Sequence, residues 1–238
     1  MARVIIPNQS FICLLQDINQ TVIIDANLII PPDRSSIAIK NSASLKLEFD
    51  KYEDAFLDPL FRIFPSVAIH DSVYKEVSQH QSMKEYIDQK IKDENIMLLK
   101  DQDLNIIEES IRSTTEEKIA QFTNYNPGID NSNDRGEVKS ISYSVAKGFI
   151  YFSTNDSNAI SLIERKELDP YLHSIKAIKV YELIYAIRFI DGKSKILKGI
   201  YKLLYHLTES EKKSNFDWTS FYEQCSTHYA QYLKKYRD

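Results

Sequence analysis

Short apolar runs alternate with longer amphipathic segments along most of this chain. Apolar, β-branched runs predict buried strands, which lie at residues 21–25, 66–70, 95–100, 149–154 and 175–180. Strands that alternate with helices are typical of a mostly parallel sheet with helices on both faces. The sequence therefore predicts an α/β fold of three layers around a mostly parallel central sheet.

Apolar residues recur at helical spacing between these runs. The spacing predicts helices at residues 52–64, 71–80, 103–122, 134–148, 156–168 and 181–190. Pro59 either interrupts the first of them or marks a join between two helices. The segment 123–133, dense in Asn, Gly, Pro and Ser, is the strongest break in the chain. Gly148 is placed to end the helix that precedes it.

The pattern divides the chain near residue 190. We expect one catalytic domain over residues 1–190 and a helical C-terminal extension over 191–238. The whole chain has a formal net charge of -4, yet basic residues outnumber acidic ones in the extension. Lys195, Lys198 and Lys202 cluster on a predicted helix there and are candidate contacts to nucleic-acid phosphates. A solvated helical tail explains the same charges equally well, and the many tyrosines of this region favour packing over base stacking.

Several classes of site are disfavoured by what the sequence lacks. The two cysteines have no C-x-x-C spacing, the histidines have no H-E-x-x-H spacing, and there is no G-x-x-x-x-G-K-[ST] loop. A disulfide framework, a zinc site and a P-loop are therefore not supported. His70-Asp71 resembles the central pair of metal-dependent phosphohydrolases, but no histidine precedes it. The N-terminal segment is too polar for a signal peptide or a spanning helix, so we expect a soluble, cytoplasmic protein without a membrane partner.

Acidic residues stand where two predicted strands end. Asp25 follows the first strand and Asp156 follows the strand at 149–154, with Asn27 and Thr154 close by in the sequence. Carboxyl ends of parallel strands meet at one rim of a sheet, where ligands gather. We therefore expect these side chains to share one site.

Three further acids lie on predicted helices between the two strands. Glu76 is on one helix, and Asp134 and Glu137 are three residues apart at the start of another, so that both project from one side. Each acid also has a simple structural explanation, because Asp25 and Asp156 can cap helices and Asp134 with Glu137 resembles a capping box. Capping does not explain why acids far apart in the sequence would gather at one rim of the sheet, so we favour a shared metal site.

In this interpretation the catalytic metal ligands are Asp25, Glu76, Glu137 and Asp156, with Asp134 as a further ligand. Asn27 and Thr154 support them through hydrogen bonds. Carboxylates are the ligands that Mg²⁺ and Mn²⁺ prefer. Because packed carboxylates repel one another, at least one should have a raised pKa.

The order and spacing of these motifs resemble those of the PIN-domain nuclease family over about residues 21–190. That family has a strand ending in Asp, a helical Glu, a helical Asp or Glu, and an Asp after a later strand. Gly136, Glu137, Ile141, Ala146 and Gly148 are similar to a subgroup in which Glu takes the third place. Residues 31–65 are longer than a minimal member needs and the C-terminal extension has no counterpart in small toxin members. Both departures bear on the substrate rather than on the metal site.

The resemblance implies a Mg²⁺- or Mn²⁺-dependent endoribonuclease, which hydrolyses RNA to 5′-phosphate and 3′-hydroxyl ends through a metal-activated water. It also implies a toxin–antitoxin or defence role, with an antitoxin, another regulatory protein or a second copy of the chain as partner. A DNA-directed, structure-specific nuclease and an inactive PIN-like binding module remain alternatives. The acid set argues against the latter.

Overall fold

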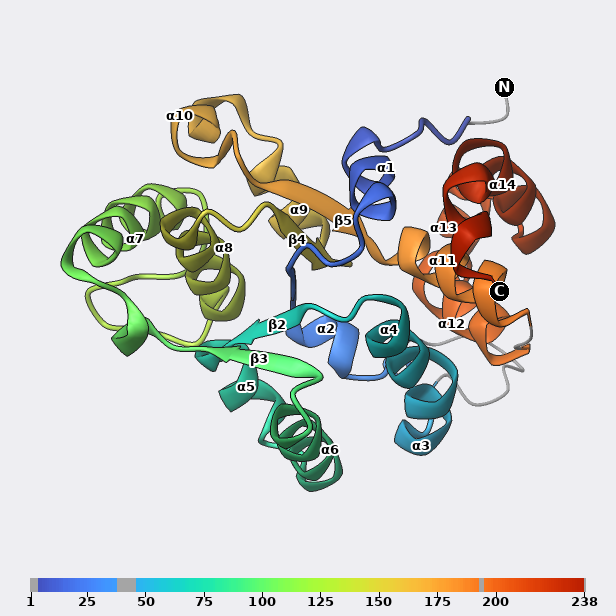
Figure 1. Ribbon diagram of the computed structural model, residues 1–238, viewed down its shortest axis with the longest axis horizontal. Helices are drawn as coiled ribbons and strands as arrows, with labels where there is room; N and C mark the ends of the chain where they lie inside the picture. Colours follow the sequence, from blue (N-terminus) through green and yellow to red (C-terminus); the bar gives the residue numbers. More distant parts are fainter. Residues whose placement is uncertain (1–3, 38–45, 193–194, 238) are drawn as a thin grey trace. The chain divides into compact units, whose positions relative to one another are not determined.

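The fold is built on a five-stranded parallel sheet, seen in the computed structural model of residues 4–37, 46–192 and 195–237 (Figure 1). The strands run in the order β3-β2-β1-β4-β5 and are all parallel to their neighbours. Helices flank the sheet, so the predicted three-layer α/β fold is confirmed. The strands are β1 (Val22–Ile24), β2 (Val67–His70), β3 (Ile96–Leu99), β4 (Tyr151–Thr154) and β5 (Lys176–Lys179).

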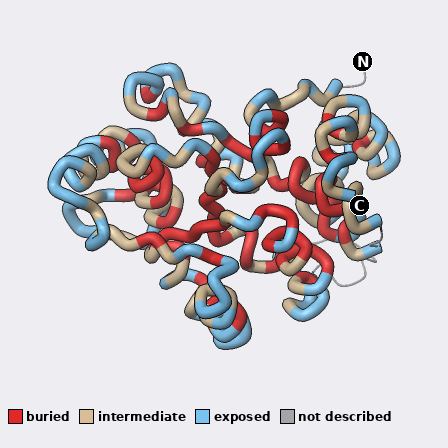
Figure 2. Tube along the Cα trace, viewed as in Figure 1, coloured by how far each residue is buried: buried red, intermediate tan, exposed pale blue. Residues whose placement is uncertain are grey.

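The three central strands are buried along their whole length (Figure 2). In β1, Ile23 lies opposite Ala68 of β2 and Phe152 of β4, and all three side chains are fully buried. Parallel strands covered on both faces must be apolar throughout, which explains why these runs show no alternation of polar and apolar residues. The same strands belong to a core that includes Val138 and Ile141 of a flanking helix.

Contacts group the chain into two compact units, described separately below. Unit 2 comprises residues 19–30 and 64–179 and contains the whole sheet, and unit 1 comprises residues 1–18, 31–63 and 180–238. The predicted domain boundary between residues 190 and 191 comes from the sequence pattern and not from contacts, and it stays a prediction. In the part of the chain that the structure describes, no helix is long and apolar enough to cross a membrane.

Unit 2 carries helices that follow most of its strands, and among them α7 and α8 lie side by side (Figure 1). Gly148 ends α8 with a φ of 71°, a left-handed conformation that favours glycine, as the sequence predicts. The helices are α2 (Ala26–Ile29), α5 (Asp71–Val77), α6 (Gln81–Lys92), α7 (Ile106–Ala120), α8 (Arg135–Lys147), α9 (Ser157–Ile163) and α10 (Asp169–Leu172), with 3₁₀ turns at Asp101–Asp103 and Lys166–Leu168.

Unit 1 is helical and its core is rich in aromatic rings. Tyr201 stacks on Phe221 with ring centroids 4.2 Å apart, and Tyr185 and Tyr229 are fully buried. The tyrosines of this region therefore serve packing, as expected. The helices are α1 (Gln9–Gln16), α3 (Phe49–Tyr52), α4 (Asp58–Ile63), α11 (Val180–Asp191), α12 (Lys195–Tyr205), α13 (Glu209–Ser214) and α14 (Trp218–Leu233), with a π-helical turn at Glu53–Leu57 and a 3₁₀ turn at Lys234–Tyr236.

Several helical segments differ from the sequence-based expectation. The residues predicted as one helix over 52–64 form the end of α3, a π-helical turn and α4, and Pro59 is the second residue of α4, next to the join between the last two. Helices α1, α2, α6 and α10 were not predicted. α6 buries only Tyr86 and Ile87, so few apolar residues mark its inner face in the sequence.

Candidate functional site

The site lies where the order of the strands reverses. β1 pairs with β2 on one side and with β4 on the other, so the chain proceeds outward from β1 in one direction and later returns to its opposite edge. In open parallel sheets this reversal leaves a crevice beyond the carboxyl ends of the two strands. Asp25 directly follows β1, and Asp156 is the second residue after β4.

Asp25 is buried, with 2% of its surface exposed, and it caps helix α2. Its Oδ1 accepts a hydrogen bond from the backbone N–H of Ala26 at 2.8 Å. Its Oδ2 accepts from Thr154 Oγ1 at 2.9 Å and from Asn27 Nδ2 at 2.5 Å. The capping explanation of Asp25 is thus confirmed, but the bond from Thr154 reaches across to the neighbouring strand and capping does not require it.

The carboxyl of Asp25 is electrostatically unusual. Burial raises its pKa to about 8, and the nearby charge of Glu137 and, less strongly, that of Glu76 act in the same direction. The hydrogen bonds from Thr154 and Ala26 oppose the increase. A carboxyl that is costly to ionise beside other acids is a recognised mark of a functional site.

Thr154 and Asn27 connect the ends of the two strands. Asn27 Nδ2 donates a second hydrogen bond to Thr154 Oγ1 at 2.9 Å, and Asn27 Oδ1 accepts from the backbone N–H of Asn155 at 3.1 Å. Thr154 Oγ1 also accepts from the backbone N–H of Asp156 at 3.0 Å. Both side chains therefore hold the backbone that carries the acids.

Asp156 caps helix α9, because its Oδ1 accepts from the backbone N–H of Asn158 at 2.6 Å. Its backbone is fixed through Thr154, which also bonds to Asp25. The structural explanation is therefore correct for Asp156 as well. Capping uses one carboxylate oxygen and leaves the charge of the group near the other acids.

Glu76 of α5 and Glu137 of α8 lie near each other, because the charge of Glu76 acts on Glu137. The carboxyl of Glu76 lies beside the start of α8, where a Cβ at position 136 would stand 3.4 Å from Glu76 Oε2, an ordinary van der Waals distance. Burial raises the pKa of Glu137, and the charges of Asp156, Glu76 and Asp134 raise it further. Although Glu76 is an exposed residue, the protein atoms around its carboxyl raise the pKa, and Arg135 opposes this.

Asp134 does not form the capping box that the sequence suggested. It precedes α8 with a φ of 52°, and its side chain makes no capping bond. Instead its Oδ2 accepts from Asn124, from the backbone N–H at 2.8 Å and from Nδ2 at 3.3 Å. The left-handed backbone turns the carboxylate toward the preceding loop, so the D-x-x-E pattern with Glu137 predicted the wrong local contact.

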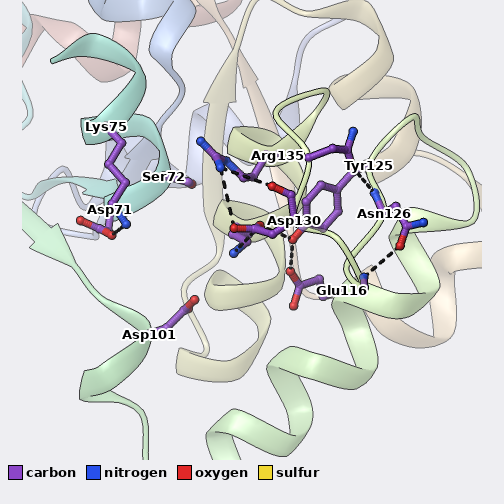
Figure 3. A network of polar contacts seen from close by, with 12 residues as sticks. Asp71, Ser72, Lys75, Asp101, Glu116, Tyr125, Asn126, Asp130 and Arg135 are labelled. Carbon is purple, nitrogen blue, oxygen red and sulfur yellow. Dashed lines mark hydrogen bonds and ion pairs between the residues drawn. The ribbon is translucent and has the colours of Figure 1, made fainter. Parts of the chain in front are cut away.

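The loop before α8 is fixed by a buried tyrosine (Figure 3). The hydroxyl of Tyr125 lies 2.8 Å from Oε1 of Glu116 on α7 and 2.8 Å from Oδ1 of Asp130 in the loop. Lys139 and Arg135 form ion pairs with Asp130 at 2.9 and 3.7 Å. These contacts hold residues 123–134 against α7 and α8, and thereby fix one side of the acidic site.

The donor groups fit a hard cation, because all of them are carboxylates whose charges act on one another. Among residues 4–37, 46–192 and 195–237, however, no three Asp, Glu, His or Cys side chains stand close enough together to hold one metal ion. Binding one ion there would require Glu76 and Glu137 to turn toward Asp25.

All seven candidate residues of the site belong to unit 2. The structure joins Asp25, Asn27, Thr154 and Asp156 by hydrogen bonds and brings Glu76, Glu137 and Asp134 within electrostatic range of them. Lys195, Lys198 and Lys202 belong to unit 1, where they are exposed on α12.

Sequence reasoning missed Arg135, which moderates the pKa of Glu76, and Asn124, which holds Asp134. Asn124 reaches Asp134 because the loop after α7 folds back to the start of α8, and Arg135 reaches Glu76 because the start of α8 lies near α5. Arg135 directly precedes Gly136 in the D-R-G-E run, so its adjacency to the motif was a signal that could have identified it.

Comparison with known proteins gave no match, since no family model fits the chain and no curated protein or solved structure resembles it significantly. The resemblance to PIN-domain nucleases therefore depends on the quoted residues alone and stays a prediction.

Without divalent cations, the contribution of Asp25 to the free energy of unfolding should fall as pH rises from 3.8 to about 8. The Asp25 carboxyl ionises near the lower value in the unfolded chain and near the upper value in the folded protein. The folded state therefore binds more protons across this interval, and stability falls by up to about 1.4 kcal/mol per pH unit for that proton. The raised pKa values of Glu76 and Glu137 act in the same direction.

Urea denaturation in EDTA at a series of pH values measures this slope. The Asp25→Asn variant should have a flatter slope, because it cannot take up the proton. Asp169→Asn, at an exposed aspartate outside the site, is the matched control and should keep the wild-type slope. An unchanged slope in Asp25→Asn would show that Asp25 does not hold the proton.

Proposed function

We propose that this protein is a Mg²⁺- or Mn²⁺-dependent nuclease that hydrolyses phosphodiester bonds, with RNA as the favoured substrate. One observation carries the proposal. A buried aspartate at the tip of β1 is hydrogen-bonded to the tip of β4, at the reversal of the sheet, and its pKa is raised first by burial and then by the charges of Glu137 and Glu76. An acidic crevice at this position suits a bound cation and a polyanion together.

The residues that would hold the metal are Asp25, Glu76, Glu137 and Asp156, with Asp134 as a further ligand. A divalent cation bound there would supply an activated water for attack on phosphorus and would neutralise charge on the phosphate. Bound cations would also offset the repulsion among the acids. The free-energy cost of ionising the buried Asp25 would then be lower in the metal-bound protein than in the metal-free protein. Electrostatic repulsion between carboxylates thus becomes a source of metal affinity.

The other residues of the site position these acids. Thr154 and Asn27 donate hydrogen bonds to one oxygen of Asp25 and thereby fix the plane of its carboxyl group. Arg135 lies close enough to Glu76 to oppose its protonation and so favours the charged form that binds a cation. Asn124 keeps Asp134 turned toward the loop.

Parallel digestion of RNA and DNA with Mg²⁺, Mn²⁺ or EDTA separates this proposal from its alternatives. Cleavage of RNA that requires a divalent cation supports it. Cleavage restricted to DNA would indicate a DNA-directed nuclease, and binding without cleavage would indicate an inactive module. A toxin-like role, an antitoxin or other regulatory partner, a homodimer and a cytoplasmic location remain predictions from the resemblance and the sequence.

Asp25→Asn and Asp156→Asn should each abolish cleavage in Mg²⁺ while leaving the protein folded. Each change removes one carboxylate from the group and keeps the shape of the side chain. Cleavage of a labelled RNA is measured together with the melting temperature. Asp169→Asn removes a carboxylate outside the site and should cut at the wild-type rate. Wild-type cleavage by either site variant would exclude that residue as a ligand.

Mn²⁺ or Mg²⁺ should raise the melting temperature of the wild-type protein. An ion that binds only the folded state stabilises it by about 2.7 kcal/mol at a hundredfold excess over Kd. The rise should be smaller in Asp25→Asn and undiminished in Asp169→Asn. Differential scanning fluorimetry over a range of Mn²⁺ concentrations measures the effect. A wild-type melting temperature that does not respond to Mn²⁺ would argue for the inactive module.

Changing Lys195, Lys198 and Lys202 to Gln should weaken RNA binding at low salt and leave the metal requirement of cleavage unchanged. Lysines in contact with phosphates release counterions, so each lost contact reduces the slope of log affinity against log salt by about 0.7 for a single strand. Binding is measured on the Asp25→Asn background to prevent cleavage.

The matched control carries the same loss of charge at exposed or partly exposed lysines elsewhere, namely Lys51, Lys92 and Lys176. This control should change the slope less than the α12 variant does. Equal slopes in the two variants would mean that the lysines of α12 contact no phosphate.

A further inference from the structure

A pocket of about 320 Å³ opens beside the acids and extends away from them. Asp134, Glu137 and Asp156 belong to its lining, so it is continuous with the proposed metal site. The remainder of the lining comes from the loop after α7, from helix α9 and from Arg165 just beyond that helix. Its main side chains are Phe122, Asn124, Asn158, Leu162 and Arg165.

Phe122 and Arg165 form one wall of this pocket from two planar groups, an aromatic ring and a guanidinium. Phe122 is a large apolar residue with 39% of its surface exposed. The Cζ of Arg165 lies 4.6 Å from the centroid of the Phe122 ring, so the guanidinium and the ring form a pair. Both groups can stack against a planar ligand.

The edges of the pocket carry polar groups that can form hydrogen bonds with a ligand and so distinguish one ligand from another. Asn124 and Asn158 each present a side-chain amide, which has both a donor and an acceptor. Such amides form paired hydrogen bonds to the edges of nucleobases. Tyr125, directly after Asn124, holds the loop through Glu116 and Asp130, so this wall of the pocket is already formed.

The charges of the lining exclude other classes of ligand. Three carboxylates face one guanidinium, so a free phosphate would be repelled. A cationic ligand would be repelled by the guanidinium of Arg165, which lies against Phe122, the aromatic residue among the described lining residues, whereas a neutral planar ligand can stack on the outer face of this pair. A neutral, planar ligand with polar edges satisfies both conditions, and the volume suits a small-molecule-sized group.

We propose that this pocket receives the base of a nucleotide adjacent to the phosphodiester bond that is cut. The inference rests on the proposed nuclease function and adds a substrate class to it. A base within a duplex has its faces stacked and its edge paired, so only an unpaired nucleotide can enter. A single-stranded nucleic acid presents such a nucleotide without the cost of unpairing it and is therefore the preferred substrate, and the pocket selects the nucleotide at one position beside the cut.

The test compares Phe122→Leu, which keeps apolar bulk and removes the ring, with Phe122→Tyr, which keeps the ring. Binding of a fluorescent single-stranded RNA oligonucleotide is measured in EDTA, so that nothing is cleaved. Phe122→Leu should weaken binding about five- to hundredfold, the range of one lost stacking contact, and Phe122→Tyr should restore it. Phe189→Ala removes another ring that lies near a guanidinium, that of Arg237, and should bind like the wild type.

Abasic substitution along the oligonucleotide locates the base. In the wild type, one position should lose affinity by the same factor as Phe122→Leu, and in that variant the same substitution should have no further effect. A matched RNA duplex should bind more weakly and be insensitive to Phe122→Leu.

Two outcomes would overturn the inference, and they are distinguishable. If the wild type binds the oligonucleotide and cuts it in Mg²⁺, but Phe122→Leu binds equally well, the pocket holds no base and the nuclease proposal stands. If the wild type neither binds nor cuts single strands, both proposals fail.

Discussion

The pairing of β1 with β4 determines where Asp25 and Asp156 lie, and the rest of the site is arranged around these two acids. In this register Ile24 stands opposite Ser153, and the backbone N–H of Asp25 donates to the carbonyl of Ser153 at 3.1 Å. The ladder thus continues one residue beyond β1 and draws Asp25 into the protein. Its side chain then has no access to bulk water and must find its hydrogen bonds within the fold. Thr154, the last residue of β4, lies at the position that provides one.

Burial makes ionisation of the Asp25 carboxyl unfavourable, and the surrounding acids make it more unfavourable still. Three donors surround its oxygens, yet its pKa is raised to about 8 because desolvation and the charge of Glu137 outweigh them. A core placed under selection for stability alone would replace such a group by an apolar one. The presence of several acids at one reversal of the sheet is what the proposed metal site would account for, because a bound cation would compensate their charge.

The sequence predicted the structure correctly where the local pattern of apolar residues alone determines an element. Apolar runs identified all five strands, and Asp25 and Asp156 were recognised because each follows such a run. The order of the strands was beyond local reasoning, since pairing between β1 and β4 depends on contacts far apart in the chain. Asp134 was misjudged for a related reason, because its left-handed backbone and its bonds to Asn124 follow from the fold of a loop. The pocket with Phe122 and Arg165 is formed by separate segments that no sequence motif connects.

The two segments of unit 2 are interleaved with the three segments of unit 1 along the chain. This order affects how the protein can form during synthesis. Every residue of unit 2 precedes α11, whereas unit 1 needs α14 to complete the packing of α1 and α11. Because chains emerge from their N-terminal end and compact units fold as they appear, the sheet with its acids can assemble while α1 still lacks its partner. Helix α1 is thus made before the sheet but is packed only after α14 has emerged, so its apolar face needs protection in the interval.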